Sequence, residues 1–200
     1  MYRQILAAIP VKPFGVAKRR LSGRLTPVQR TRLGREVAAR TAAAAADTGV
    51  SVAVVTGDDG VATWARSLGF ETIDESYSRK PGLDGAASAV VIEAERRQMP
   101  WAIIHADLPL ATSDSLRSIF DLAETSTVLV PSYNGGSNLV AGRDPRFRFR
   151  YGPLSFHRHL AANPRAIVRI QPQLALDLDT EADLDRALQS PAGRWLESFV

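Results

Sequence analysis

Short apolar runs alternate with helical segments along most of this chain, and that alternation constrains the fold more than any other feature of the sequence. The apolar runs, which are expected to be strands, cover residues 4–9, 50–56, 70–74, 101–106 and 127–131. Helical character lies between them, over residues 27–47, 59–68, 83–98 and 112–124. This pattern predicts an α/β fold with a mostly parallel central sheet and helices on both faces.

The pattern changes after residue 131. Residues 134–170 are rich in turn formers and carry strand pieces with a period of two, and residues 174–179 are expected to form a last strand. A short helix over residues 180–188 is predicted next, because Thr180 and Asp183 make a weak N-terminal capping pattern. No linker, repeat or low-complexity segment interrupts the sequence, which predicts a single domain over residues 1–200.

Charge and composition exclude several classes of protein. Lys and Arg number 25 against 21 Asp and Glu, a net charge of +4, but the arginines are spread among acidic residues. A site for small, highly charged anions is therefore favoured over nucleic-acid binding. The absence of cysteine excludes disulfides, thiolate zinc sites and a cysteine nucleophile, and is compatible with a cytoplasmic location. No apolar run of about 18 residues exists, so no membrane span is expected, and the N-terminus is typical of a first strand rather than a signal peptide.

A basic loop follows the first predicted strand, and open α/β sheets bind ligands beyond the carboxyl ends of their strands. Its four cations are Lys12, Lys18, Arg19 and Arg20. Such a cluster suits a polyphosphate, with lysine acting as a point charge and arginine as a fork. A solvated loop that happens to be basic is the equal alternative from spacing alone.

Three aspartates are candidate magnesium ligands. Asp107 is placed just beyond the strand over residues 101–106, where it would bind Mg²⁺ together with substrate oxygens or, alternatively, form a turn before the next helix. Asp177 and Asp179 would share one face of the last strand, about 7 Å apart. The alternative is a solvated edge strand in which Asp179 or Thr180 caps the next helix.

Glycine-rich and aromatic segments form a further candidate site. The Gly135-Gly136 pair allows backbone amides to approach an anion, or else forms a hairpin turn. Residues 147–151 alternate aromatic and arginine side chains, and Pro153 is expected at the first position of a helix that contains Ser155. Such a helix N-terminus binds anions. His157 and His159 would face different sides of that helix, so a histidine metal site is not expected, and both are interpreted as surface or structural residues.

Two further loops, residues 56–59 and 80–86, enter predicted helices on the ligand side of the sheet. They would hold a nucleoside or serve as ordinary strand-to-helix turns, and the second interpretation is the default. The sequence has no dinucleotide-binding fingerprint, no P-loop and no nucleophile elbow. A nicotinamide-dependent dehydrogenase, a P-loop ATPase and an α/β-hydrolase are therefore disfavoured.

Taken together, the segments IPVKPFGVAKRRL, HADLPL, GGSN, FRFRYGPLSFHRHL and LALDLDT resemble one family in order and spacing. The chain is similar to the guanylyltransferases of deazaflavin coenzyme biosynthesis from about residue 9 to residue 184. The resemblance implies a Rossmann-like, nucleotide-diphospho-sugar transferase (GT-A-like) fold. It also implies transfer of GMP from GTP to the phosphate of phosphoenolpyruvate, 2-phospho-L-lactate or 3-phospho-D-glycerate, with release of pyrophosphate.

The same resemblance implies roles for particular residues. The magnesium ligands would be Asp107, Asp177 and Asp179, and the acid would be held by Ser137, Gly152 and Ser155. The nucleotide would meet Lys12, Lys18, Arg20, Gly82 and Asp84, with Lys18, Arg20 and Asp107 as the catalytic groups. This chain departs from the family pattern at two of these positions, with Asp84 in place of an asparagine and Ser137 in place of a threonine.

Several alternatives stay open at this point. The sequence does not choose among the three acids, and a transferase that uses another nucleotide or acid is one alternative function. A noncatalytic nucleotide-binding relative is another. The expected partners are GTP, Mg²⁺ and a phosphorylated acid, without nucleic acid or membrane. The oligomeric state is open, with a homodimer as one alternative.

Overall fold

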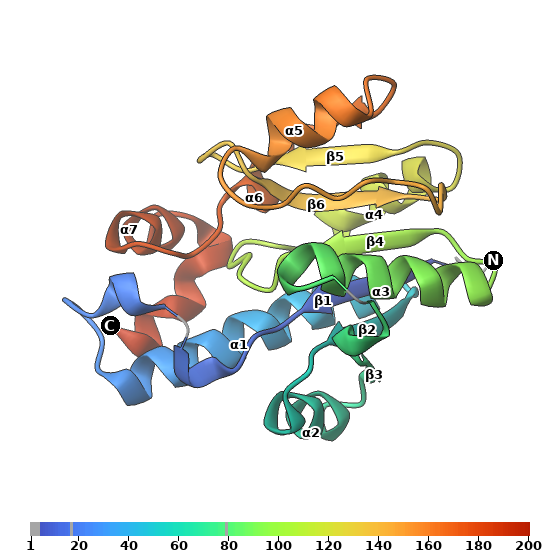
Figure 1. Ribbon diagram of the computed structural model, residues 1–200. Coiled ribbons are helices and arrows are strands. Elements are labelled where there is room, and N and C mark those ends of the chain that lie inside the picture. Colours follow the sequence, from blue (N-terminus) through green and yellow to red (C-terminus); the bar gives the residue numbers. More distant parts are fainter. Residues whose placement is uncertain (1–4, 17, 79) are drawn as a thin grey trace.

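A single sheet organises the part of the chain that the computed structural model describes, residues 5–16, 18–78 and 80–200. Within these residues, seven strands pair in the order β3-β2-β1-β4-β6-β5-β7 (Figure 1). Their bounds are β1 Leu6–Pro10, β2 Ser51–Val55, β3 Glu71–Ile73, β4 Trp101–Ile104, β5 Val128–Pro131, β6 Ser137–Gly142 and β7 Ile167–Val168. The five strands predicted before residue 132 are confirmed, except that residue 4 of the first predicted strand lies outside the described residues.

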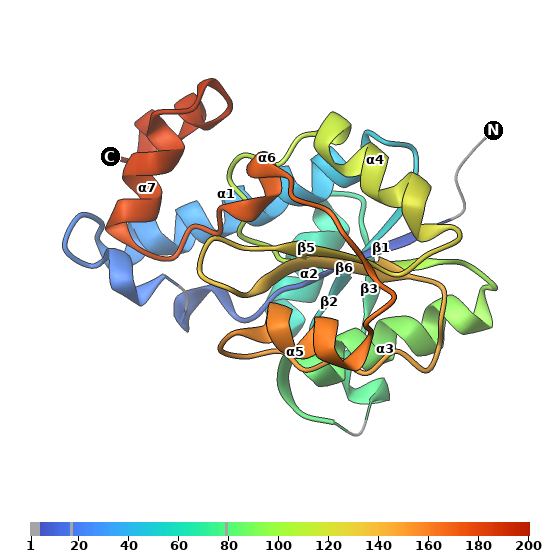
Figure 2. The same ribbon diagram turned by 90° about the horizontal axis from the view of Figure 1, so that it is seen from above.

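Helices cover both faces of this sheet, as predicted. Their bounds are α1 Pro27–Ala46, α2 Asp59–Ser67, α3 Gly82–Arg96, α4 Ser113–Ala123, α5 Ser155–Ala162, α6 Pro172–Ala175 and α7 Glu181–Leu188. Helices α1 and α4 lie on one face and α3 and α5 on the other (Figure 2). Capping boxes at Thr26, Thr112 and Thr180 begin α1, α4 and α7, so the helix predicted after Thr180 is confirmed.

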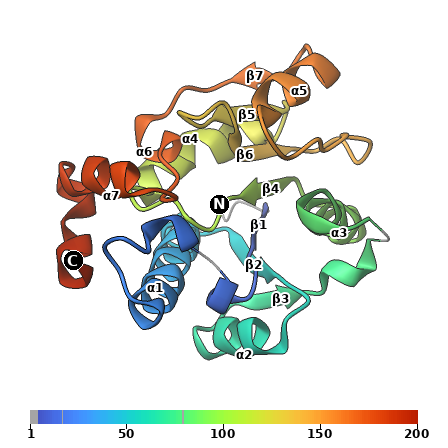
Figure 3. The same cartoon turned by 60° about the vertical axis from the view of Figure 1, so that its left-hand side comes forward.

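The sheet is mostly parallel, and β6 is the strand that runs against its neighbours. Strands β3, β2, β1 and β4 pair in parallel, and β6 pairs antiparallel with both β4 and β5. Because β6 is reversed, it starts at the edge where β4 and β5 end. Ser137, its first residue, therefore lies at the same edge as the carboxyl ends of the parallel strands. Figure 3 shows β6 beside β5 and β4.

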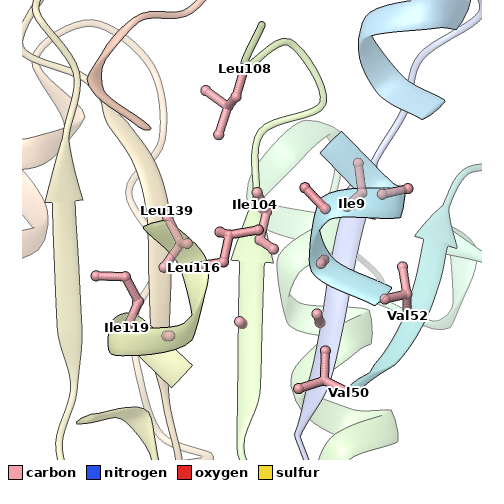
Figure 4. Close-up of a cluster of buried hydrophobic side chains, with 14 of the residues drawn as sticks. Ile9, Val50, Val52, Ile104, Leu108, Leu116, Ile119 and Leu139 are labelled. Carbon is pink, nitrogen blue, oxygen red and sulfur yellow. The ribbon is translucent and has the colours of Figure 1, made fainter. Parts of the chain in front are cut away.

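Successive side chains of the central strands enter two different cores. In β4, Ala102 and Ile104 pack with α1 and α4, whereas Trp101 and Ile103 pack with α3. Figure 4 shows Ile104 of β4 beside Leu116 of α4 in the first of these cores. Strands buried on both faces need apolar residues at every position, which explains the continuous apolar runs of the sequence.

The predicted last strand, over residues 174–179, is wrong. Residues 172–175 form the short helix α6, and residues 176–179 are extended without a strand partner. The carbonyls of Leu174 and Ala175 instead accept hydrogen bonds from the Asn138 side chain and the Tyr133 backbone. The alternation of burial survives, because Leu176 and Leu178 are buried while Asp177 and Asp179 are partly exposed.

The period-two segment over residues 147–151 is not a strand either. Its aromatic rings are turned inward, and Phe147 and Phe149 each pack 5.4 Å from Trp101 between ring centroids. The backbone N–H groups of Arg150 and Tyr151 donate to the side chains of His159 and Asp84. These backbone N–H groups thus donate to side-chain acceptors, and they are not available to the carbonyl groups of a neighbouring strand.

Helix α5 begins later than the sequence predicts. Its first residue is Ser155, preceded by Leu154 in the left-handed region at φ 54°, so Pro153 lies in the turn before the helix rather than at its first position. Ser155 still lies in the first helical turn, as predicted. Across residues 5–16, 18–78 and 80–200, no helix combines the length and apolar character that a membrane crossing requires.

Candidate active site

A cavity of about 340 Å³ opens where the parallel strands β1, β2 and β4 end. Among its lining residues are Lys12, Lys18, Glu75, Gly82, His105 and Asp107. They come from the loops after β1, β3 and β4 and from the start of α3, so the strand order alone brings them together. The cavity is called the nucleotide cavity below, after the role that the sequence predicts for its residues.

Lys18 lies deep in the cavity between two carboxylates. Its ammonium nitrogen is 2.7 Å from Asp107 Oδ2 and 3.4 Å from Asp179 Oδ1, and its side chain is only 7% exposed. Burial alone would favour the neutral forms of Lys18 and Asp107. Their attraction outweighs it, so the pKa of Lys18 is raised and the pKa of Asp107 is lowered.

The segment with Asp177 and Asp179 is tied to the end of β4 by its backbone. The Leu178 N–H donates to the Asp107 carbonyl at 2.9 Å, and the Asn134 side chain donates to Asp177 Oδ2 at 2.9 Å. Burial raises the pKa of Asp177, and repulsion from Asp107 and Asp179 raises it further. The carboxylates of Asp107 and Asp179 therefore repel that of Asp177, and the negative charge of the three aspartates exceeds the single positive charge of Lys18.

These aspartates do not form a ready-made three-carboxylate cage. In the part of the chain described, no three His, Cys, Asp or Glu side chains gather closely enough to hold a metal ion. Mg²⁺ usually takes only one or two protein carboxylates and completes its shell with substrate oxygens. The hard oxygen donors and the uncompensated charge of this cluster fit such an ion.

A second group of polar residues lies at the start of β6 and α5, and it is called the acid site below after the role that the sequence predicts for it. The N–H of Ser137 donates to Ser155 Oγ at 3.0 Å, and Ser137 Oγ lies 2.9 Å from His159 Nδ1. Nε2 of His159 accepts from the Arg150 N–H at 2.8 Å. Ser137, Ser155 and His159 are buried. Gly152 belongs to the acid site too, and its φ of +111° is one that side chains rarely adopt.

The glycine pair does not offer free amides in the way the sequence suggested. Gly135 N–H donates to the Ser132 carbonyl and Gly136 N–H to Ser132 Oγ, so the hairpin-turn alternative is the observed one. At α5, the N–H groups of Ser155 and Phe156 donate to the carbonyls of Gly152 and Gly135. Among the described residues, no hydrogen-bond partner is present for the next two N–H groups of α5, those of His157 and Arg158, so these amides and the serine hydroxyls remain as donors at this site.

The other predicted nucleotide residues are only partly brought together. Lys12 and Gly82 line the nucleotide cavity. Arg20 is exposed in a 3-10 turn and is not among the lining residues, so its role stays a prediction. Asp84 is also outside the lining and accepts a hydrogen bond of 2.7 Å from the Tyr151 N–H, which an asparagine oxygen would also accept. Asp58 caps α2 through the Val61 N–H, as expected of an ordinary strand-to-helix turn.

Three residues of this region were missed from the sequence. His105 lines the cavity, and its Nε2 is buried without a hydrogen-bond partner in the described structure. The same holds for the hydroxyl of Tyr151, whose ring centroid is 5.7 Å from that of His105. Glu75 lines the far end of the cavity, beyond β3. The position of His105 directly before Ala106 and Asp107 was the available signal, because strand alternation puts it on the same face as Trp101 and Ile103.

Comparison with known proteins adds an independent finding. The family model described as "Guanylyl transferase CofC like" matches residues 5–194. A phosphoenolpyruvate guanylyltransferase from Nocardia farcinica is 34% identical over 197 residues, covering 94% of this chain and 86% of that protein. A 2-phospho-L-lactate guanylyltransferase from Methanobrevibacter ruminantium is 26% identical over 214 residues, covering 98% and 92%.

Proteins with little sequence identity to this chain share its fold. The crystal structure of a candidate nucleotide-diphospho-sugar transferase from Desulfovibrio desulfuricans G20 superposes with a TM-score of 0.72 at 13% identity. The alignment covers 98% of this chain and 96% of that one. At this identity the likeness shows the fold alone, and it confirms the fold class predicted from the sequence.

Proposed function

This chain belongs to the CofC-like guanylyl transferase family, and we propose that it transfers GMP from GTP to the phosphate of a phosphorylated three-carbon acid. Pyrophosphate is the second product, and the reaction would be a step of deazaflavin coenzyme biosynthesis. The observation that carries the proposal is the Lys18–Asp107–Asp179 charge cluster in the nucleotide cavity, beside the strand ends from which the acid site is built.

The order of the strands supports one orientation of the nucleotide. Glu75 follows β3 and Asp107 follows β4, and these strands are separated by β2 and β1. Three strand spacings place the two loops about 14 Å apart along the sheet edge. The cations Lys12 and Lys18 favour phosphates, and Lys18 lies at the Asp107 end, so the base would lie toward β3.

The chemistry at the base end suits guanine. The Glu75 carboxylate is exposed and receives no side-chain hydrogen bond or ion pair from the described residues. It lies against the turn after β2, where a Cβ added to Gly57 would be 2.9 Å from Glu75 Oε1. Guanine presents two adjacent donors, N1–H and the exocyclic amine, that match two carboxylate oxygens, whereas adenine presents an acceptor at N1.

The transfer step itself needs no protein nucleophile. An oxygen of the acid's phosphate forms a bond to the α-phosphorus of GTP while the bond to the β-phosphate oxygen breaks, and its electron pair leaves with pyrophosphate. The protein's contribution is to align the two anions and to neutralise charge. Lys18 would provide that charge next to Asp107, and its raised pKa keeps it protonated.

Magnesium would complete the charge balance. One or two of the carboxylates of Asp107, Asp177 and Asp179 would hold it, and its contribution would be to neutralise phosphate oxygens when both substrates are bound. Ser137, Gly152 and Ser155 would hold the acid at the start of β6 and α5. The serine hydroxyls there would provide hydrogen bonds to its oxygens.

A substrate panel tests the proposed function. GTP, ATP, CTP and UTP are each combined with phosphoenolpyruvate, 2-phospho-L-lactate and 3-phospho-D-glycerate in the presence of Mg²⁺, and pyrophosphate release is measured. Turnover with GTP and one of the acids is the expected result. Turnover only with another nucleotide would contradict the choice of GTP, and GTP binding without turnover by any pair would favour a noncatalytic protein.

A further inference from the structure

We propose that His159 is a positioning residue that turns the hydroxyl proton of Ser137 toward the acid substrate, an inference that rests on the proposed function. His159 is on the same face of α5 as Ser155, one turn further along. It is fully buried and touches both the start of β6 and residues 150–151. The argument depends on which atoms donate and which accept.

The backbone determines the tautomer of His159. The Arg150 N–H is a donor in every protonation state of the protein, and it lies 2.8 Å from His159 Nε2. Nε2 must therefore be the unprotonated, accepting nitrogen. A neutral imidazole then carries its proton on Nδ1. Because Nδ1 is 2.9 Å from Ser137 Oγ, the imidazole is the donor and the serine oxygen is the acceptor.

Burial keeps the imidazole in that neutral form. The pKa of His159 is lowered to about 4, first by burial and then by the charges of Arg158 and His105, against an opposing effect of Asp84. A second proton on Nε2 would face the Arg150 N–H and place two donors against each other. The buried position therefore protects the hydrogen-bond direction at neutral pH.

The hydroxyl proton of Ser137 is free to be donated to a ligand in this arrangement. Its oxygen already accepts from His159, and within residues 5–16, 18–78 and 80–200 no hydrogen bond takes the proton. The hydroxyl proton of Ser155 is free in the same way, because the Ser155 oxygen accepts from the Ser137 N–H. Two buried hydroxyls at one site thus retain a proton each, and a buried donor without an acceptor is costly. The oxygens of a phosphate or carboxylate are the acceptors that suit such a pair.

Two substitutions separate the positioning role from a packing role. In His159→Asn the amide nitrogen takes the place of Nδ1 and can still donate to Ser137, while the acceptor for Arg150 is lost. In His159→Gln the side-chain oxygen reaches the place of Nε2 and accepts from Arg150, while the donor to Ser137 is lost. Each variant removes part of the same ring and one hydrogen bond, so each serves as the control for the other's loss of packing.

Kinetics of pyrophosphate release then test the proposal. His159→Gln is expected to raise the KM for the acid about tenfold and leave the KM for GTP unchanged, because a hydrogen bond to a charged group is disturbed. His159→Asn should raise the acid KM less than threefold. In a Ser137→Ala background the effect of His159→Gln on the acid KM should disappear. Exposed His157, replaced by Gln on the same helix, should change neither constant.

Equal effects of the two His159 variants on the acid KM would overturn the proposal, as would an undiminished effect in the Ser137→Ala background. If the variants do not fold, the ¹⁵N NMR spectrum of the His159 ring in the wild-type protein decides. A proton on Nδ1 at neutral pH supports the arrangement, and a proton on Nε2 overturns it. Failure of the proposed function would show separately, as a wild-type protein that releases no pyrophosphate with any nucleotide and acid.

Discussion

At the proposed nucleotide end of the site Lys18 is held between two carboxylates, whereas at the proposed acid end Ser137 and Ser155 are held by uncharged groups. The first arrangement depends on Coulomb attraction, which has little directional preference and acts on a long side chain. The second depends on hydrogen bonds of 2.8–3.0 Å among buried backbone and side-chain atoms. Direction, not charge, organises the acid end.

This difference implies different tolerances. A charged cluster can accept the phosphates of a nucleotide by exchanging partners, since Lys18 already pairs with a carboxylate that a metal ion would also bind. A hydrogen-bond arrangement admits one orientation of each proton and fails when a replacement removes the donor or acceptor that sets that orientation. We therefore expect changes at the charged end to affect turnover as a whole, and changes at the acid end to affect one substrate.

The largest effect is expected from Asp107→Asn. The substitution removes the carboxylate closest to Lys18 and a predicted metal ligand, so turnover should fall on the order of 100-fold or more. Circular dichroism should show that the fold is retained, since Asp107 lies beyond the end of β4. Asp114→Asn, at an exposed carboxylate on α4, is the control. Unchanged turnover at saturating magnesium would contradict the role of Asp107.

The pH dependence of the free energy of unfolding should reveal that the His159 imidazole is buried. The ordinary pKa of His159 is 6.5 and its folded value is about 4, so between these values the unfolded chain binds a proton that the folded chain does not. Stability is complete above pH 6.5 and is lost as the pH falls, by about 2 kcal/mol at pH 5 and about 3 kcal/mol at pH 4.

Urea denaturation at pH 7 and pH 5 measures this loss, because most carboxylates remain ionised in that range. His159→Asn removes the titrating group and should flatten the dependence. A wild-type protein that is equally stable at both pH values would show that the imidazole of His159 is accessible to a proton when folded.

Gly152→Ala should act on the acid alone. The φ of +111° disfavours a side chain by about 1–2 kcal/mol, and an added Cβ would lie 3.0 Å from Arg158 Nη2. We expect a several-fold increase in the KM for the acid and none in the KM for GTP. Gly49→Ala is the matched control, because Gly49 has a φ of +86° with nothing within 4 Å of an added Cβ. A larger effect on the KM for GTP than on the KM for the acid would show that each substrate binds at the site predicted for the other.

Glu75→Gln should weaken guanine recognition at the base end of the nucleotide cavity, three strand spacings from the charged cluster. The amide keeps one acceptor oxygen and loses the other, so the KM for GTP should rise about tenfold. Inosine triphosphate lacks the exocyclic amine, and its KM should change less. An unchanged ratio of GTP to ATP use would show that the base is read elsewhere.

The smallest effect is expected from Tyr151→Phe. The hydroxyl of Tyr151 is buried and has no partner in the described structure, so its removal should raise the free energy of unfolding by about 1 kcal/mol. Denaturant titration of both proteins measures the change. A less stable variant would indicate that the hydroxyl is hydrogen-bonded in solution.

The local pattern of the sequence was sufficient for the parallel half of the molecule. Mostly apolar runs predicted β1, β2 and β4, and the segments of helical character between them predicted the helices. Because parallel strands end at a common edge, the loops with Lys18, Asp107 and Glu75 had to meet there. The position of Lys18 and Asp107 at that edge could be predicted, because each follows a strand of the parallel sheet in the sequence.

The acid end was decided by the tertiary structure. Nothing local marks β6 as a reversed strand, yet its reversal is what carries Ser137 to the ligand edge. Residues 147–151 and 174–179 alternate like strands, but their backbone groups pair with His159, Asp84, Asn138 and Tyr133 instead of a sheet neighbour. Periodicity records which side chains are buried. It does not record which partner each backbone group finds, because that partner comes from a distant part of the chain.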